Sequence, residues 1–526
     1  MLRSSLGPLQ SILRRDESRP GSHHFVTILI GSLLCLGVYV SVQLILADDF
    51  HSFVYLGLVI CLAVIFVAVL KDWKRGVYYF LAWITFEDLI RKYMGNNMLI
   101  FFAKDFLVLS LYISFIAARR SSRVKNLLKP SFRMPLLFFV WLGVLQVFNP
   151  ASTSFFYGLL GLKLYFLYIP LLWIGYALLN DEREIRRLFF FSCVLILAVA
   201  AVGIAQSILG HSFLNPTYLQ EDIREVSTLY RVSPTTGAIA YRPTSVFVST
   251  GRFVNLLVIS WVFALGFSGY LLMRKQSGRW LPIITVGAVA AAALMSTSRG
   301  VIVWLLVSLL AMGAAFLWGV SWTKEQHLQI MRAIRRSAVV VVIAISILVA
   351  LFPDAVASRV DILSETLSPW STKSEFALRA HEYPLDNFVR AFDFPRWPYG
   401  YGIGTASLGV QYVTRILHAT PMKIGVENGY GQLVLELGIV GLLLWIILTW
   451  AVCRSAWKAA NLLRGTRAFP LAFGLYWNAF LLLLPMSFYG LNAYQDFIVN
   501  AYLWLTLGCL FRMPELVRTQ AAQALP

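Results

Sequence analysis

The chain has 526 residues, of which 58% are hydrophobic and only 13% charged, and its mean hydropathy is +0.70. A soluble protein carries about a quarter charged residues, so the composition excludes a soluble enzyme or binding protein. The formal charge of +19 would suit a nucleic-acid partner, but the sequence has no long basic tract and no basic–aromatic RNA-binding pattern. The five cysteines fall within or beside apolar segments, which predicts neither a disulfide framework nor a cysteine metal site.

Apolar segments of about twenty residues recur along the whole chain, the length that an α-helix needs to cross a bilayer. Such segments must be helical, because in lipid every backbone amide needs a partner within its own segment. We therefore predict an all-α polytopic membrane protein with about 14 transmembrane helices. The candidate spans are 25–47, 53–70, 77–90, 98–117, 135–148, 157–179, 188–209, 253–273, 280–295, 301–320, 337–352, 429–451, 468–488 and 495–511.

Basic residues gather in alternate loops, among them KDWKR, DEREIRR and CRSAWKAANLLRGTR. Of the 45 Lys and Arg, 29 fall on this side, 14 fall on the other side, and Lys104 and Lys163 lie inside spans. The positive-inside rule therefore predicts an even number of spans with both termini in the cytoplasm. The span 77–90 ends in Glu87 and Asp88, and the count changes by two if the chain turns back there.

Two long segments lie on the non-cytoplasmic side and hold most of its basic residues. Because membrane orientation gives these charges no purpose, they predict a functional site there. The predicted organisation is a cytoplasmic arm 1–24, helices 1–7 in 25–209, a first long loop 210–252, helices 8–11 in 253–352, one large loop 353–428, helices 12–14 in 429–511 and a cytoplasmic tail 512–526.

Two arginines on this side are candidate ligands for an anion. Arg299 lies in the short turn STSRG between two spans, and Arg242 lies in YRPT just before the span 253–273. The planar guanidinium matches phosphate oxygens. Arg299 would equally extend to the membrane interface without binding any ligand.

The large loop ends with two further features. Gly400, Gly402 and Gly404 in YGYGIGTASLG would let the backbone approach a ligand, or would join a re-entrant piece to the next span. Glu427 lies at the mouth of that span, where the helix dipole alone would stabilise it. Glu436 lies about 12 Å further along the helix, and we favour a structural contact with another helix for this carboxylate.

The remaining intramembrane charges are the Lys104–Asp105 pair and Lys163. Charges at membrane depth are costly unless they are paired or face a wet cavity. We predict that these three residues are buried partners and not ligands.

Taken together and in this order, the motifs resemble the O-antigen ligase and polymerase superfamily of bacterial envelope membrane proteins. The matching features are SRG at an external turn, RPTSVF entering a span, and a long late loop that closes with G-x-G and then ENGY and LELGIVG in the next helix. The resemblance covers roughly residues 240–445. It implies metal-independent glycosyl transfer at the periplasmic face of the inner membrane, in which an acceptor hydroxyl displaces polyprenyl pyrophosphate from the donor glycan.

The resemblance also implies roles for individual residues. In ligases of the family, a histidine before an asparagine is taken as the base, whereas this chain has Glu427 in E-N. That departure favours the polymerase-like branch that builds O-antigen, exopolysaccharide or capsule, with His418 as the second candidate base. Arg299, then Arg242, then Arg379 would stabilise the leaving pyrophosphate. The implied partners are the lipid-linked glycan, the lipid bilayer and a chain-length regulator, with no nucleic acid, no metal and no cofactor.

Two other functions remain open on the sequence. A metal-dependent polyprenyl-phosphate sugar transferase would use an acidic pair in the first external loop, where Asp48 and Asp49 stand. A transporter or flippase of lipid-linked sugars would suit the span count and the intramembrane charges. The halves of the chain show no repeat of the kind that many transporters have.

Overall fold

The structure is a computed structural model of the whole chain, and it describes residues 50–95, 97–121, 128–216, 230–232, 237, 239–274, 278–318, 323–367, 383–407, 410, 426–490 and 495–523. The chain divides into two compact units, 1–71 and 72–526. The described part of the first unit is one apolar helix, α3 (Phe50–Lys71).

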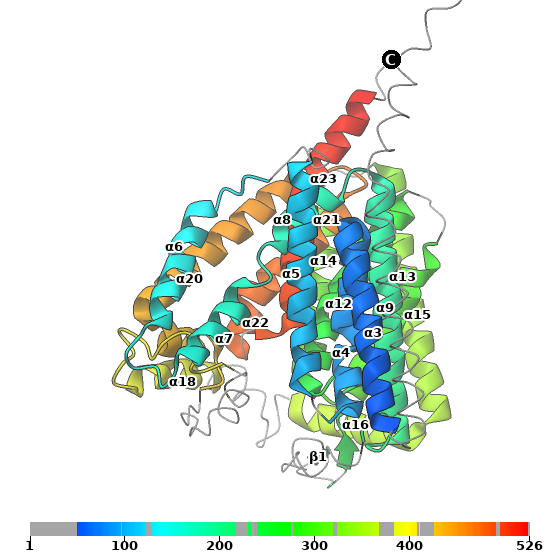
Figure 1. Cartoon of the computed structure of the whole chain (residues 1–526). Coiled ribbons are helices and arrows are strands. Elements are labelled where there is room, and N and C mark those ends of the chain that lie inside the picture. Colours follow the sequence, from blue (N-terminus) through cyan, green and yellow to red (C-terminus); the bar gives the residue numbers. More distant parts are fainter. Residues whose placement is uncertain are drawn as a thin grey trace, which may run out of the picture. The chain divides into compact units, whose positions relative to one another are not determined.

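The second unit is built almost entirely of helices (Figure 1). They are α4 (Trp73–Tyr93), α5 (Met98–Arg120), α6 (Arg133–Val147), α7 (Phe155–Phe166), α8 (Leu171–Leu178), α9 (Glu182–Leu209), α12 (Thr250–Met273), α13 (Trp280–Met295), α14 (Arg299–Trp318), α15 (Lys324–Leu351), α16 (Pro353–Leu367), α18 (Tyr383–Arg390), the 3₁₀ turn η2 (Ala391–Asp393), α20 (Gly429–Asn461), α21 (Phe469–Leu483), α22 (Pro485–Tyr489) and α23 (Phe497–Gln523). One antiparallel pair of strands, β1 (Tyr230–Val232) and β2 (Ile239–Tyr241), interrupts them.

Within the described ranges, ten helices or helix pairs are long and apolar enough to cross a membrane, and α6 and α13 are shorter apolar helices. The chain is thus an all-α multi-pass membrane protein, as its composition predicts. The count of 14 spans stays a prediction. Span 25–47 lies outside the described residues, and α4 is not among the ten because charges occupy both of its ends.

Two predicted spans are each broken into two helices. Span 157–179 becomes α7 and α8, which are separated by a turn that ends at Pro170. Span 468–488 becomes α21 and α22, with the break just before Pro485. Proline has no backbone N–H and cannot continue the hydrogen-bond ladder, which accounts for both breaks.

The bundle packs closely where small residues let helices approach. A Cβ atom at Gly175 of α8 would lie 2.0 Å from the carbonyl oxygen of Leu505 in α23. In the same way, a Cβ atom at Gly508 of α23 would lie 2.0 Å from the carbonyl oxygen of Leu172. Membrane helices use glycine at such crossings because backbone contact replaces the hydrophobic drive that lipid removes.

α20 is kinked at Gly438, where the backbone has φ 72° and ψ −174°. The segment that follows η2 runs beside the kink and hydrogen-bonds to the carbonyl and amide groups that the kink releases. The three bonds are Tyr401 N to Leu435 O (2.7 Å), Gly402 N to Glu436 O (3.1 Å) and Ile439 N to Pro398 O (3.3 Å). A broken helix is tolerated at membrane depth because neighbouring backbone satisfies its freed groups.

The glycines of the large loop lie where the segment 398–404 packs against the kink of α20, which we call the junction. Gly400, Gly402 and Gly404 all have positive φ, and a Cβ at Gly404 would lie 2.1 Å from the carbonyl oxygen of Tyr157. Glu436 is fully buried; its carboxylate accepts hydrogen bonds from Ala406 N (2.9 Å) and from the hydroxyl of Tyr165 (2.8 Å). These are the contacts of a structural carboxylate that ties the loop to α7 and α20.

We expect Gly438→Ala to lower the stability of the protein by about 1–3 kcal/mol, because a side chain at positive φ is strained. The added Cβ would also lie 2.4 Å from Pro398 O. Thermal unfolding in detergent measures the effect. Gly313→Ala is the matched control, since Gly313 lies inside α14 with no atom within 4 Å of the added Cβ. If both variants unfold at the same temperature, the kink is not required.

Candidate functional site

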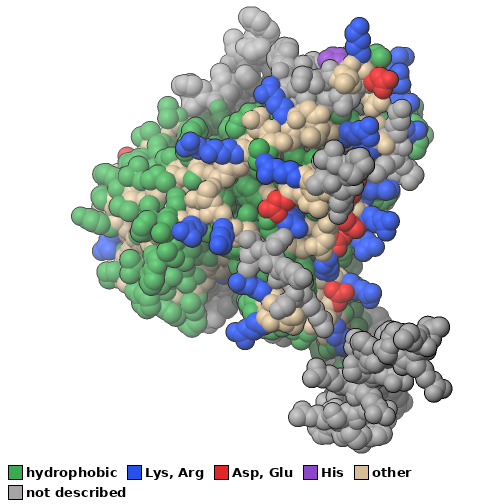
Figure 2. All heavy atoms as spheres, turned by 90° about the horizontal axis from the view of Figure 1, so that it is seen from above, with side chains coloured by type: hydrophobic (Ala, Val, Ile, Leu, Met, Phe, Trp, Pro, Cys, Tyr) green, Lys and Arg blue, Asp and Glu red, His purple; other side chains and the backbone are tan. Residues whose placement is uncertain are grey.

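The described elements of the two long loops of the sequence lie at the same end of the second unit. Figure 1 shows β1, α16 and α18 at this end and the C-terminal end of α23 at the other. Figure 2 looks onto the opposite end, where Lys and Arg side chains outnumber Asp and Glu. The exposed basic residues of the turns at that end include Arg183, Arg187, Arg464 and Arg467. Such an excess is typical of a cytoplasmic face.

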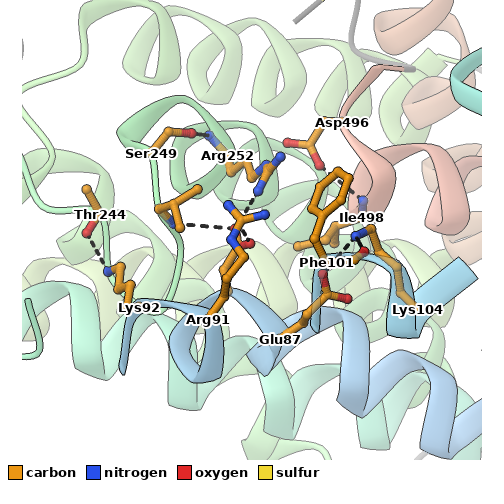
Figure 3. Close-up of polar contacts among 12 residues, drawn as sticks. Glu87, Arg91, Lys92, Phe101, Lys104, Thr244, Ser249, Arg252, Asp496 and Ile498 are labelled. Atoms are coloured by element: carbon orange, nitrogen blue, oxygen red, sulfur yellow. Dashed lines mark hydrogen bonds and ion pairs between the residues drawn. The ribbon is translucent and has the colours of Figure 1, made fainter. Parts of the chain in front are cut away.

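The last turns of α4 bury four charged residues. Glu87, Asp88, Arg91 and Lys92 are each 1% exposed or less. Figure 3 shows Glu87 beside Lys104 of α5, Arg91 extending toward Arg252 of α12, and Lys92 beside Thr244. Buried charges are stable only when they are paired and hydrogen-bonded, so the partners of these four residues define the cluster.

On one side of the cluster, carboxylates pair with the two lysines that the sequence places inside spans. Lys104 Nζ lies 2.7 Å from Glu87 Oε1, and Lys163 Nζ lies 2.5 Å from Asp105 Oδ2. Both ammonium groups lie close to the ring of Phe101, with Lys104 Nζ 3.6 Å and Lys163 Nζ 4.4 Å from its centroid. Lys104 and Asp105 are buried, Lys163 is half-buried, and each has an oppositely charged partner, as the sequence predicts.

On the other side, Asp88 bridges two arginines. Its carboxylate lies 3.3 Å from Arg91 of the same helix and 2.5 Å from Arg252 in the first turn of α12. Asp496, just before α23, caps that helix by accepting a hydrogen bond from Ile498 N (3.0 Å), and Figure 3 shows its carboxylate beside Arg252. Arg252 therefore joins three segments of the bundle.

Side chains of α4 and α9 hold the RPTS segment, residues 242–245, by hydrogen bonds. Lys92 Nζ donates to Thr244 Oγ1 and to Ser245 O, both at 2.9 Å. Gln206 Oε1 of α9 accepts from Thr244 N (2.8 Å) and Ser245 N (2.7 Å). Ser245 has φ +53°, a conformation that costs energy for a residue with a side chain. These bonds hold the half-buried Arg242, two residues before Thr244, at the outer edge of the bundle.

The turn that precedes Arg299 is also held by neighbours. Thr297 has φ +54°, and its carbonyl accepts from Arg231 Nη1 of β1 (3.2 Å). Arg359 of α16 donates to Met295 O (3.1 Å) and, through a second nitrogen, to Ser207 O (3.0 Å). Burial lowers the pKa of Arg359 to about 10, so this guanidinium stays charged at neutral pH. Arg299 itself is half-buried and begins α14.

Two loop side chains beside the RPTS segment also have shifted pKa values. Burial raises the pKa of the Tyr241 hydroxyl to about 12, so this group stays protonated. Burial and the nearby Lys92 charge lower the pKa of His211, which packs edge-on against Tyr241 with ring centroids 5.7 Å apart. His211 is therefore neutral at physiological pH, and arginine supplies the positive charge of this region.

Glu427 lies just before α20 and is exposed. Its carboxylate accepts a hydrogen bond from the Tyr383 hydroxyl, and its backbone N–H donates to Asn387 Oδ1 (3.1 Å), so both contacts come from α18. Asn428 caps α20 by accepting from Tyr430 N and Gly431 N, each at 2.9 Å. The Asn428 cap fixes the position of the Glu427 backbone, and the Glu427 carboxylate is exposed to solvent.

The described contacts divide the candidate residues into two groups. Arg242 and Arg299 flank the β1–β2 hairpin, since Arg242 follows Tyr241 of β2 and β1 touches the turn before Arg299. Glu427 belongs to the second group, because its two hydrogen bonds go to Tyr383 and Asn387 of α18. His418, Arg379, Asp48 and Asp49 lie outside the described residues.

Several residues of this region were not predicted individually from the sequence. They are Arg91, Lys92, Arg231 and Arg359, all of which belong to the 14 basic residues on the non-cytoplasmic side. The number of basic residues on that side was the one feature of the sequence that indicated a site there. Their partners are mostly backbone carbonyls and hydroxyls of distant segments, which no local pattern indicates.

Comparison with models of known protein families found no match, and comparison with curated proteins found none either.

Proposed function

We propose that the chain is a membrane glycosyltransferase of the O-antigen polymerase or ligase type. It would join a polyprenyl-pyrophosphate-linked glycan to a sugar hydroxyl at the periplasmic face, for O-antigen, capsule or exopolysaccharide synthesis. The observation that carries the proposal is that β1 and α16, which hold the turn before Arg299, and α18, which holds the exposed Glu427, lie at the same end of the bundle (Figure 1).

The arginines supply what a pyrophosphate leaving group needs. Arg242 and Arg299 are half-buried, and each has contacts within the protein. Arg91 and Arg252, by contrast, face the carboxylates of Asp88 and Asp496 in the interior of the bundle. A partly desolvated guanidinium group stabilises the charge that develops on a departing diphosphate.

The proposed reaction is a displacement at the anomeric carbon of the donor. The acceptor hydroxyl gives its proton to the Glu427 carboxylate while its oxygen forms the new glycosidic bond. The bond between the anomeric carbon and the diphosphate oxygen breaks, and that oxygen keeps the electron pair. Arg242 and Arg299 stabilise the resulting negative charge. The polyprenyl pyrophosphate is then released into the bilayer.

We expect Arg299→Gln to reduce the rate of glycan transfer by about 10²–10³-fold, the loss typical of removing one group that stabilises transition-state charge. The measurement is product formation by purified protein in liposomes with lipid-linked donor and acceptor. Arg390→Gln is the control, because Arg390 is an exposed residue at the end of α18. Equal rates for Arg299→Gln and the parent chain would remove Arg299 from the proposed site.

A transporter or flippase of lipid-linked sugars is the second candidate, favoured by the buried charges of α4 and α5. Their short pairings, 2.7 Å for Lys104–Glu87 and 2.5 Å for Lys163–Asp105, are more typical of fixed structural pairs than of a pathway that ions or sugars traverse. The metal-dependent transferase that would use Asp48 and Asp49 is tested by chelation, which would abolish its activity and leave the arginine-based reaction intact.

A further inference from the structure

A groove lies between α6 and α20, beside the kink of α20. It is lined by the end of α6 and the following turn, by the segment 396–400 and by α20 around Leu437 and Val440. Its volume of about 600 Å³ falls within the range of about 300–1,000 Å³ that is usual for small-molecule sites. None of these elements carries the buried charge cluster or the arginine-bearing turns.

The groove is apolar and open. Leu145 is 65% exposed, Phe148 is 71% exposed and Val440 is 52% exposed. The exposed faces of the same two helices continue this character with Leu137, Phe138, Trp141, Leu443, Ile446 and Ile447. In a membrane protein, contiguous apolar side chains of this kind face hydrocarbon, so the groove opens toward lipid.

Arg396 is the one positively charged side chain among the lining residues. Arg396 is exposed, and no carboxylate of the described part of the chain pairs with it. The two amides of the groove serve the fold instead, because Gln146 donates to Tyr399 O (2.8 Å) and Asn149 donates to Gly400 O (3.1 Å). The groove therefore combines apolar walls with a single positive charge, which is the complement of a lipid with one anionic phosphate.

We propose that this groove binds an anionic phospholipid of the bilayer, with an acyl chain between α6 and α20 and the phosphate on Arg396. A phosphodiester carries one negative charge and is matched by one guanidinium. A polyprenyl diphosphate carries more charge than a single arginine balances, and several arginines stand elsewhere at the proposed glycosyl-transfer site. Basic pockets between membrane helices are known to select anionic headgroups in this way.

The bound lipid would stabilise the junction beneath it. Gly400 and Leu437 line the groove, and the adjacent backbone of both segments makes the hydrogen bonds that repair the kink. A ligand that binds only the folded chain raises its apparent stability by mass action. The proposal does not depend on the glycosyltransferase assignment, and its failure would leave that assignment untouched.

The test uses the purified full-length chain, delipidated in a neutral detergent, with thermal unfolding followed as lipid is added. We expect phosphatidylglycerol to raise the unfolding temperature and phosphatidylcholine to have little effect. Arg396→Gln should weaken the apparent affinity for phosphatidylglycerol about tenfold, the loss of one charged hydrogen bond. Arg390→Gln, which removes an exposed arginine outside the groove, should leave the affinity unchanged.

A second variant tests the acyl-chain site without touching the charge. Val440→Trp should fill the groove and abolish the response to phosphatidylglycerol while the protein remains monodisperse, because Val440 is largely exposed. Equal responses to the two phospholipids, or an equal loss of affinity in Arg390→Gln, would overturn the proposal. A larger stabilisation by undecaprenyl diphosphate that depends on Arg396 would also overturn it and would assign the groove to the carrier lipid.

Discussion

Glu427→Gln is expected to reduce glycan transfer by about 10²–10⁴-fold, which is the usual contribution of a general base. The amide keeps the size of the side chain but cannot accept the proton of the acceptor hydroxyl. Stability should change little, because Glu427 is exposed and the Asn428 side chain caps α20 independently. The rate of product formation in reconstituted liposomes, together with the unfolding temperature, measures both effects.

Asp386→Asn provides the matched control for this variant. Like Glu427, Asp386 is an exposed carboxylate. It lies on α18, the helix that supplies both contacts of Glu427. It should transfer glycan at the parent rate. A Glu427→Gln protein that polymerises normally would show that the base is another group, and His418 would then be tested.

Lys104→Met is expected to destabilise the protein by about 3–5 kcal/mol, because it leaves the Glu87 carboxylate buried without its cation. Both side chains are 1% exposed or less, and the bond between them is 2.7 Å long. The double variant Glu87→Gln/Lys104→Met should recover most of the loss, since a buried ion pair often contributes little net stability over neutral groups. Thermal and denaturant unfolding of the three variants gives the coupling energy.

The double variant also separates a structural pair from a transport pathway. If the pair only supports the fold, the double variant should still transfer glycan at a rate close to the parent rate. If the double variant is as unstable as Lys104→Met, removing the Glu87 charge does not restore stability. The ion pair is then not what stabilises these two buried groups.

The helices were predictable because their cause is local. An apolar segment of sufficient length must become a helix in lipid, and from residue 50 onward every predicted span overlaps a helix or a broken helix pair. The paired role of Lys104 and Lys163 was predictable for a similar reason, since charges at membrane depth need partners. The identity of the partners was only partly visible, because Glu87 lies in a different helix.

The features that the sequence did not predict depend on distant segments. The kink at Gly438 is stable only because the backbone of 398–402 bonds to the groups that it frees. The strained turn at Thr297 is held by Arg231 and Arg359, which come from two separate loops. Neither arrangement has a local pattern, because the residues that meet are tens of positions apart in the chain.

The most direct test of the proposed activity is reconstitution of the purified chain into liposomes that contain polyprenyl-pyrophosphate-linked repeat units and an acceptor glycan, with a chelator present. The proposal predicts that glycan products lengthen and that free polyprenyl pyrophosphate accumulates in proportion to the glycosidic bonds formed. Movement of the lipid-linked units across the bilayer without any growth of glycan would contradict the account and identify a transporter.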